Sequence, residues 1–143
     1  MARTDRLIYL ISMAHLTLRT HIHSLLTESS IRLTVPQATV LFLLIEQDGR
    51  MMSELGQFIG VDNSAMTGLI DRLEKRGFVR RETKQEDRRA LLIRITPEGR
   101  NEAGRAAKII RGVNEKIKAS LKADQIEVFM GILGGIVEQC KGK

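Results

Sequence analysis

The chain contains 143 residues, a length typical of a single domain, and 43% of them are hydrophobic, which is sufficient to build a core. The formal net charge of +6 favours a polyanionic partner, although charge alone specifies no fold. The one cysteine, Cys140, excludes an internal disulfide and a cysteine-rich metal site, and it fits a reducing cytosol.

The first predicted element is a long helix over residues 4–26. Apolar residues recur along it at spacings of three, four and seven, at Leu7, Ile11, Ala14, Leu18 and Leu25. So narrow a stripe is typical of a helix that packs on other helices, and His21 is expected at the edge of that packed face. The N-terminal stretch lacks the features of a signal peptide, and the longest apolar run, residues 40–45, is too short to cross a bilayer. We therefore expect a cytoplasmic protein.

A capping box marks the start of a second helix. Thr34 supplies the cap and Gln37 stands three residues later, while the proline between them is tolerated because first-turn amides lack intrahelical partners. Apolar residues continue the helix as far as Ile45. The Asp48-Gly49 pair predicts the turn that ends it.

Two further helices are separated by only a few residues. Ser53 is expected to cap a short helix that stops at Gly60. Asp62 is expected to cap the next helix, which runs to about Arg76 and stops at Gly77. A tight, glycine-containing connection between two helices is typical of a helix-turn-helix.

The helix that Asp62 caps has two contrasting faces. Four apolar residues recur at positions i, i+3, i+4 and i+7, a spacing that places them on one buried face. They are Met66, Leu69, Ile70 and Leu73. The opposite face carries Ser64, Thr67, Gly68, Asp71 and Arg72. Small hydrogen-bonding residues followed by an arginine suit a helix that enters a DNA groove, although an ordinary amphipathic surface helix has a similar pattern.

A β-hairpin is expected after this helix. Residues 78–81 and 90–95 are predicted as strands, and residues 83–89 form a polar connection between them. Residues 75–94 carry eight cations and three anions, so most of the excess positive charge lies in this stretch. An arginine at a hairpin tip can enter a narrow minor groove, and Asp87 can hold Arg89 in one rotamer by a charge-assisted hydrogen bond. A solvated charged loop is the alternative.

Two long helices are predicted to end the chain, over residues 97–121 and 124–140. Thr96 and Pro97 form the cap and first position of the earlier one. The later one contains Gly131, Gly134 and Gly135. A glycine inside a helix costs about 1 kcal/mol relative to alanine, and close contact with a second copy of the chain would explain that cost. A frayed helix end is the alternative.

Four stretches of the chain, in this order and at this spacing, resemble the multiple-antibiotic-resistance regulator (MarR) family of winged helix-turn-helix repressors. They are LTVPQATVLFLL, SELGQFIGVDNSAMTGLIDRLEKRGFVRRE, EDRRALLIRIT and PEGR, and they cover about half the chain. Asp71-Arg72-Leu73 resembles the recognition-helix motif of the family, and Asp87-Arg88-Arg89 resembles its wing motif.

The resemblance implies a mainly α fold with a small β-wing. Residues 34–96 would form the winged helix-turn-helix DNA-binding lobe, and residues 1–33 and 97–143 would supply dimerisation helices that intertwine. It also implies a homodimer on a pseudo-palindromic site in double-stranded DNA. The expected function is a transcription regulator, in particular a repressor released by a small-molecule ligand.

The resemblance also assigns DNA contacts. The recognition-helix contacts would be Asn63, Ser64, Thr67, Gly68 and Arg72, and the wing contacts would be Lys84, Asp87, Arg88 and Arg89. Gly68 departs from the family pattern, because many members carry a longer polar or basic side chain there. Phosphate contacts or DNA shape would then carry more of the binding.

A candidate effector site lies on the first helix. Family members often bind small phenolic or other aromatic anions, and His15, Arg19 and His23 occupy nearby faces of this helix. A solvated polar stripe is the alternative, and three histidines without an acidic cluster make a weak metal site. Some members sense oxidants with a cysteine near the N-terminus, whereas Cys140 lies near the other end.

Other functional classes remain open on the sequence alone. A winged helix can also act as a protein-interaction or RNA-binding module that binds no operator. The sequence has no phosphate-cradling glycine loop, nucleophile elbow or metal-ligand spacing, so we expect no enzyme activity, no cofactor and no metal site.

Overall fold

The computed structural model describes residues 3–142, apart from the side chains of residues 3, 4, 88 and 89. The chain divides into two compact units, Met1–Ile109 and Ile110–Lys143. The predicted division at residues 33 and 96 is a separate, functional grouping and stays a prediction. None of the helices within residues 3–142 is both long and apolar enough to span a bilayer.

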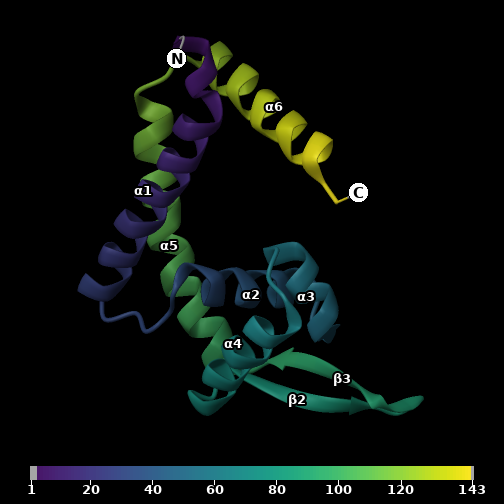
Figure 1. The fold of residues 1–143 in the computed structure, drawn as a ribbon. Coiled ribbons are helices and arrows are strands. Elements are labelled where there is room, and N and C mark those ends of the chain that lie inside the picture. The colour runs from purple at the N-terminus through teal and green to yellow at the C-terminus, as the bar shows by residue number, and fades with distance from the viewer. Residues whose placement is uncertain (1–2, 143) are drawn as a thin grey trace. The chain divides into compact units, whose positions relative to one another are not determined.

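The fold is mainly helical with one small sheet, as the sequence predicted (Figure 1). The elements are η1 (Arg3–Arg6), α1 (Leu7–Glu28), α2 (Val35–Glu46), β1 (Arg50–Met51), α3 (Met52–Ile59), α4 (Asn63–Lys75), β2 (Val79–Lys84), β3 (Asp87–Ile95), α5 (Pro97–Ala119) and α6 (Ala123–Cys140). The first unit contains the elements from η1 to the first half of α5, and the second contains the rest of α5 and α6.

The sheet has three antiparallel strands in the order β1-β3-β2, one more strand than the sequence predicted. In β1, Arg50 pairs with Ile93 of β3. The hairpin strands are also longer than expected, because β2 reaches Lys84 and β3 begins at Asp87, and an irregularity between Thr83 and Lys84 shifts their register. Most of the predicted connection over residues 83–89 is therefore strand.

Helix ends follow local hydrogen bonds. The Thr34 capping box is present, since Gln37 N–H donates to Thr34 Oγ1 at 3.3 Å and Thr34 N–H donates to Gln37 Oε1 at 3.0 Å. Helix α3 begins before the predicted cap, because Met51 is its N-cap and Met51 N–H donates to Glu54 Oε1 at 3.5 Å. Ser53 thus lies inside α3, and the prediction that it caps this helix was wrong.

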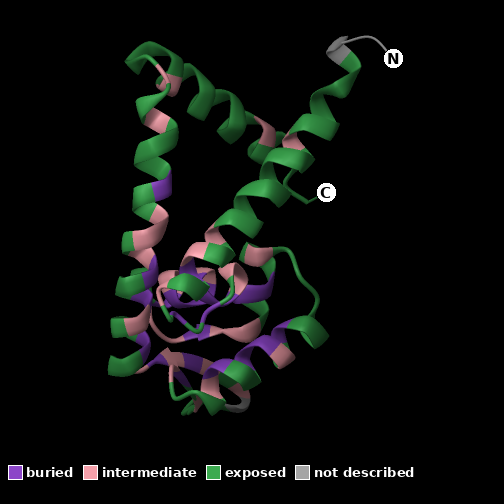
Figure 2. Cartoon of the chain, turned by 90° about the vertical axis from the view of Figure 1, so that its left-hand side faces the viewer, coloured by how far each residue is buried: buried purple, intermediate pink, exposed green. Residues whose placement is uncertain are grey.

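The core of the first unit lies beneath α2, α3, α4 and the sheet, where buried residues gather in Figure 2. Its fully buried side chains include Leu26, Leu41, Leu44, Leu55, Met66, Ile70, Leu73 and Ile93. Helix α1 contributes Leu26, the one buried residue of that helix. The residues of the predicted stripe on α1 are all exposed or half-buried. His21 is exposed rather than at a core edge.

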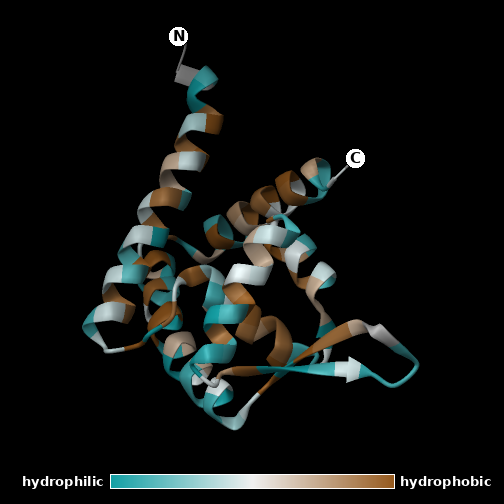
Figure 3. Cartoon of the chain, turned by 60° about the horizontal axis from the view of Figure 1, so that its bottom comes forward, coloured by the Kyte–Doolittle hydropathy of each residue, from teal (hydrophilic) through white to brown (hydrophobic). Residues whose placement is uncertain are grey.

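Helix α6 leaves its apolar side chains uncovered. None of its residues is buried, and large hydrophobic residues stand exposed along it. They include Val128, Phe129, Met130, Ile132 and Val137. Figure 3 shows this helix as predominantly hydrophobic. A Cβ added at Gly131, Gly134 or Gly135 would meet no atom of the described residues within 4 Å, so packing among these residues does not explain the glycines.

Gly99 is required by a close backbone approach in the first turn of α5. A Cβ at this position would lie 2.1 Å from the carbonyl oxygen of Phe78, which is backbone and cannot rotate away. A Cβ at Gly104, in the same helix, would meet nothing within 4 Å. We expect Gly99→Ala to destabilise the protein by about 1–3 kcal/mol through overpacking.

The control is Gly104→Ala, which should stabilise the protein by about 0.5–1 kcal/mol through helix propensity. Urea unfolding followed by circular dichroism measures both free energies. Equal effects of the two substitutions would contradict the assigned contact between Gly99 and Phe78.

Candidate nucleic-acid interface

Helix α4 is held by its cap and by its buried face. Asp62 Oδ1 accepts a hydrogen bond from Ala65 N–H at 2.8 Å, as its spacing predicted. Gly60 adopts a left-handed conformation with φ of 78° at the end of α3, so the chain can turn sharply into α4. The four apolar residues that the sequence placed on one face are all buried: Met66, Leu69, Ile70 and Leu73.

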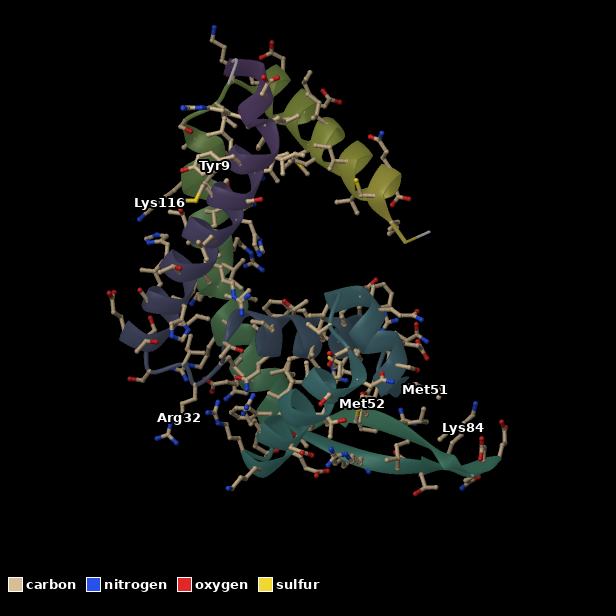
Figure 4. All side chains as sticks on the ribbon, viewed as in Figure 1. Tyr9, Arg32, Met51, Met52, Lys84 and Lys116 are labelled. Carbon is tan, nitrogen blue, oxygen red and sulfur yellow. The ribbon has the colours of Figure 1, made fainter. Side chains whose placement is uncertain are left out.

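The predicted contact residues of α4 lie on its open side. Asn63, Ser64, Thr67 and Arg72 are exposed, and Gly68 is half-buried. The Thr67 hydroxyl donates to the carbonyl oxygen of Asn63 at 2.8 Å. The sulfur of Met52 lies 3.6 Å from the same Thr67 hydroxyl oxygen. Met52 is labelled in Figure 4, at the start of α3. This contact links α3 to the exposed side of α4, and the sequence offered no signal for it.

Gly68 leaves open space on this side of α4. A Cβ there would meet no atom within 4 Å, so the lobe's own packing does not require glycine. A glycine lowers helix stability relative to alanine, and it also lets another backbone approach closely. Its presence therefore fits a surface that another molecule approaches, although the structure holds no such molecule.

The far end of the hairpin carries part of the predicted wing site. Lys84 is exposed at the end of β2, and its Nζ lies 4.0 Å from Glu86 Oε2. Figure 4 shows Lys84 near the tip of the hairpin. Asp87 is also exposed and begins β3. Arg88 and Arg89 follow it in the strand, but their side chains lie outside the described residues, so their proposed contacts stay predictions.

Nearer the helices, the cations of the hairpin are already paired. Arg94 Nε lies 2.9 Å from Glu82 Oε2, and its Nη1 lies 3.9 Å from Asp48 Oδ2. Arg80 Nη1 lies 3.7 Å from the same Glu82 carboxylate. The positive charge counted from the sequence therefore overstates what the base of the hairpin can offer to a polyanion.

Arg81 forms the most extensive ion pair between the hairpin and α4. Its Nη1 donates to Glu74 Oε1 at 2.7 Å, and its Nη2 donates to Asp71 Oδ1. The backbone N–H of Arg81 also donates to Glu74 Oε2 at 3.2 Å. The hydrogen bond with Asp71 raises the pKa of Arg81 above its ordinary value. The sequence did not indicate this pairing, because Arg81 stands ten positions from Asp71.

Two of the three candidate effector residues line a groove. Arg19 and His23 border an open groove of about 340 Å³ between α1 and the start of α2, together with Leu16, Thr20, Thr34 and Val35. His23 also borders a neighbouring groove of about 410 Å³ with Arg32 and Arg76. His15 is exposed on α1 and lines neither groove. Among the described residues, no group of three or more histidine, cysteine or acidic side chains is arranged to hold a metal ion.

Comparison with known proteins places this lobe in a family. A model of the MarR family matches residues 33–91. The chain is 30% identical over 105 residues to the HTH-type transcriptional repressor Rv2887 of Mycobacterium tuberculosis (strain ATCC 25618 / H37Rv), and this alignment covers 73% of the chain and 76% of that protein. The chain spans between 37% and 57% of the length of four other curated regulators that it matches.

Solved structures match over almost the whole chain. The repressor CouR, bound to a 23-mer DNA duplex, has a TM-score of 0.86 and 25% identity, and the match covers 94% of each chain. The regulator PcaV from Streptomyces coelicolor, in complex with its natural ligand, has a TM-score of 0.76 and 27% identity, and the match covers 96% of this chain and 98% of that one.

Proposed function

Because the chain belongs to the MarR family, we propose that it is a sequence-specific, double-stranded DNA-binding transcription regulator, and specifically a repressor that a small anion releases. The observation that carries this proposal is the arrangement of α4. Its apolar side is buried in the lobe, while its small polar residues face outward beside a cationic hairpin. The structurally similar repressor CouR is bound to a 23-mer DNA duplex, which supports the proposal.

Two kinds of DNA contact follow from this arrangement. The exposed residues at the start of α4, with the partial positive charge of the helix N-terminus, suit base edges and phosphates in a major groove. These residues are Asn63, Ser64, Thr67 and Gly68, with Arg72 further along the helix. Lys84, Arg88 and Arg89 suit the adjacent minor groove, whose potential is most negative where it is narrow. Asp87 suits a supporting role there, in which its carboxylate holds Arg89 in one rotamer.

The first test is fluorescence anisotropy of the full chain on DNA from upstream of its own gene. We expect this DNA to bind at least ~10³-fold more tightly than a scrambled duplex of equal length, with a steep salt dependence. The double variant Arg88→Ala, Arg89→Ala should weaken binding, and each lost phosphate contact should reduce the salt slope by about 0.9.

The matched control is Lys118→Ala, Lys141→Ala, which removes the same charge from the end of α5 and from the residue that follows α6. This control should change affinity much less. Equal losses in the two double variants would mean that net charge alone governs binding. Tighter binding to duplex RNA, or no binding to any nucleic acid at moderate salt, would favour an RNA-binding or a protein-interaction module instead.

We also propose that the protein acts as a homodimer. Large apolar side chains stand exposed on α1, including Leu7, Ile8, Tyr9 and Leu10, and others stand exposed on α6. Exposed apolar faces of this extent are typical of protein interfaces. A two-fold dimer would present two recognition helices to a pseudo-palindromic site. The residues assigned to dimerisation are therefore 1–33 and 97–143, and residues 34–96 form the DNA-binding lobe.

Ile132→Glu tests this interface. Ile132 is exposed on α6, so a monomer should tolerate the substitution, whereas a buried charge at a dimer interface is costly. We expect the variant to dissociate into monomers in sedimentation velocity experiments. Gln139→Glu, which adds the same charge at an exposed polar position of α6, should remain dimeric. A wild-type protein that sediments as a monomer would contradict the proposal.

The effector site that we propose is the groove beside Arg19 and His23. Arg19 offers a guanidinium that pairs well with a carboxylate, and Leu16 and Val35 offer apolar surface to an aromatic ring. This supports a small aromatic or phenolic anion as the ligand. The bound natural ligand of PcaV supports a ligand-responsive regulator, without identifying the effector of this chain.

Release of DNA by 2-hydroxybenzoate and 4-hydroxybenzoate provides the test. We expect at least one of them to lower the anisotropy of the operator complex, and Arg19→Ala to abolish this response while leaving DNA affinity unchanged. His15→Ala is the matched control, because His15 lies on the same helix but outside the groove. An equal loss of response in both variants, or no response to either compound, would contradict this assignment.

A further inference from the structure

We propose that Arg81 is a positioning residue for DNA binding, which holds β2 against the recognition helix and offsets one of the two negative charges of Asp71 and Glu74. This inference rests on the proposed function, because it concerns the same DNA-binding surface. It adds a residue that touches no predicted DNA contact directly. Its role would be to fix the angle between α4 and the wing and to remove negative charge from their shared surface.

The geometry of Arg81 suits a clamp, meaning a residue that ties β2 to α4, better than it suits a residue that contacts a phosphate. Its side chain is only 24% exposed, and both terminal nitrogens of its guanidinium face carboxylates of α4. The rigid planar fork of arginine can bond both acids at once, which the single ammonium of lysine does less well. Because the backbone N–H of Arg81 also bonds Glu74, the strand itself is tied to the helix.

Charge makes this clamp more than a packing contact. Asp71 and Glu74 stand three residues apart on α4 and therefore lie on neighbouring parts of its surface. The Asp71 side chain is 56% exposed and directly precedes Arg72, a predicted DNA contact. An unpaired carboxylate at this position would repel the phosphate backbone. Arg81 pairs with this carboxylate and so reduces the negative charge on the exposed side of α4.

The adjacent residue provides a matched control. Arg80 and Arg81 are consecutive in β2, so their side chains point to opposite faces of the sheet. The Arg80 side chain is 63% exposed and lies 3.7 Å from Glu82 of the same strand, so it does not tie the hairpin to α4. Replacing either arginine by alanine removes one positive charge, but only Arg81→Ala releases Asp71 and Glu74.

The experiment compares operator affinity and salt dependence for the full-length variants. We expect Arg81→Ala to weaken operator binding by about tenfold or more, and Arg80→Ala by only a few-fold, as for one lost rim charge. The informative variant is Arg81→Ala, Asp71→Asn, which has the same net charge as the wild type. It should recover part of the lost affinity, because the uncompensated carboxylate is gone. Arg81→Lys should fall between wild type and Arg81→Ala.

Circular dichroism and thermal unfolding first establish that each variant folds. Should Arg81→Ala fail to fold, the same comparison is made with Arg81→Gln and Arg81→Gln, Asp71→Asn, which keep a longer side chain and the same net charges. Equal losses for Arg80→Ala and Arg81→Ala, or no recovery on adding Asp71→Asn, would overturn the proposal. A purely structural role would change thermal stability without this recovery of affinity. If the wild-type protein fails to discriminate operator from scrambled DNA, the proposed function fails, which is a separate result.

Discussion

The burial of one side of α4 is the constraint on which the candidate interface depends. Met66, Ile70 and Leu73 are completely buried, so the rotation of the helix about its axis is fixed. Rotating the helix about its axis by one residue position, about 100°, would carry apolar side chains into solvent and polar ones toward the core. The side of α4 that is left open, with Thr67 and Arg72, therefore follows from the apolar spacing rather than from any contact with DNA.

Features set by local contacts were predictable from the sequence. The Thr34 and Asp62 caps and the buried face of α4 each depend on residues three or four apart, and the structure contains them all. Strand β1 was missed because it has only two residues and exists through pairing with β3, more than forty positions later. The start of α3 was misplaced because its N-cap is Met51, whose N–H donates to Glu54 Oε1, rather than Ser53.

Counting charges along the chain predicted that the candidate interface is positively charged, but not which of its positive side chains are already paired. Arg81 and Arg94 both lie in the basic stretch, yet the structure pairs each with carboxylates from other elements. Those partners lie at least seven positions away in the sequence, so no local pattern identifies them. The Arg81 clamp became visible only when the fold brought β2 beside α4. The candidate effector groove is similar, because Arg19 and Val35 lie on different helices.

Apolar periodicity predicts that a helix has a face to bury but not which molecule covers it. On α1 the periodic stripe was expected to pack on other helices, and within this chain only Leu26 of that helix is buried. Large side chains such as Leu7 on α1 and Phe129 on α6 remain exposed. Exposed apolar surface on this scale is typical of protein interfaces, and this is the basis of the proposed homodimer. In the proposed homodimer a second copy of the chain would cover these side chains with surface of the same apolar kind, and its symmetry would match that of a pseudo-palindromic DNA site.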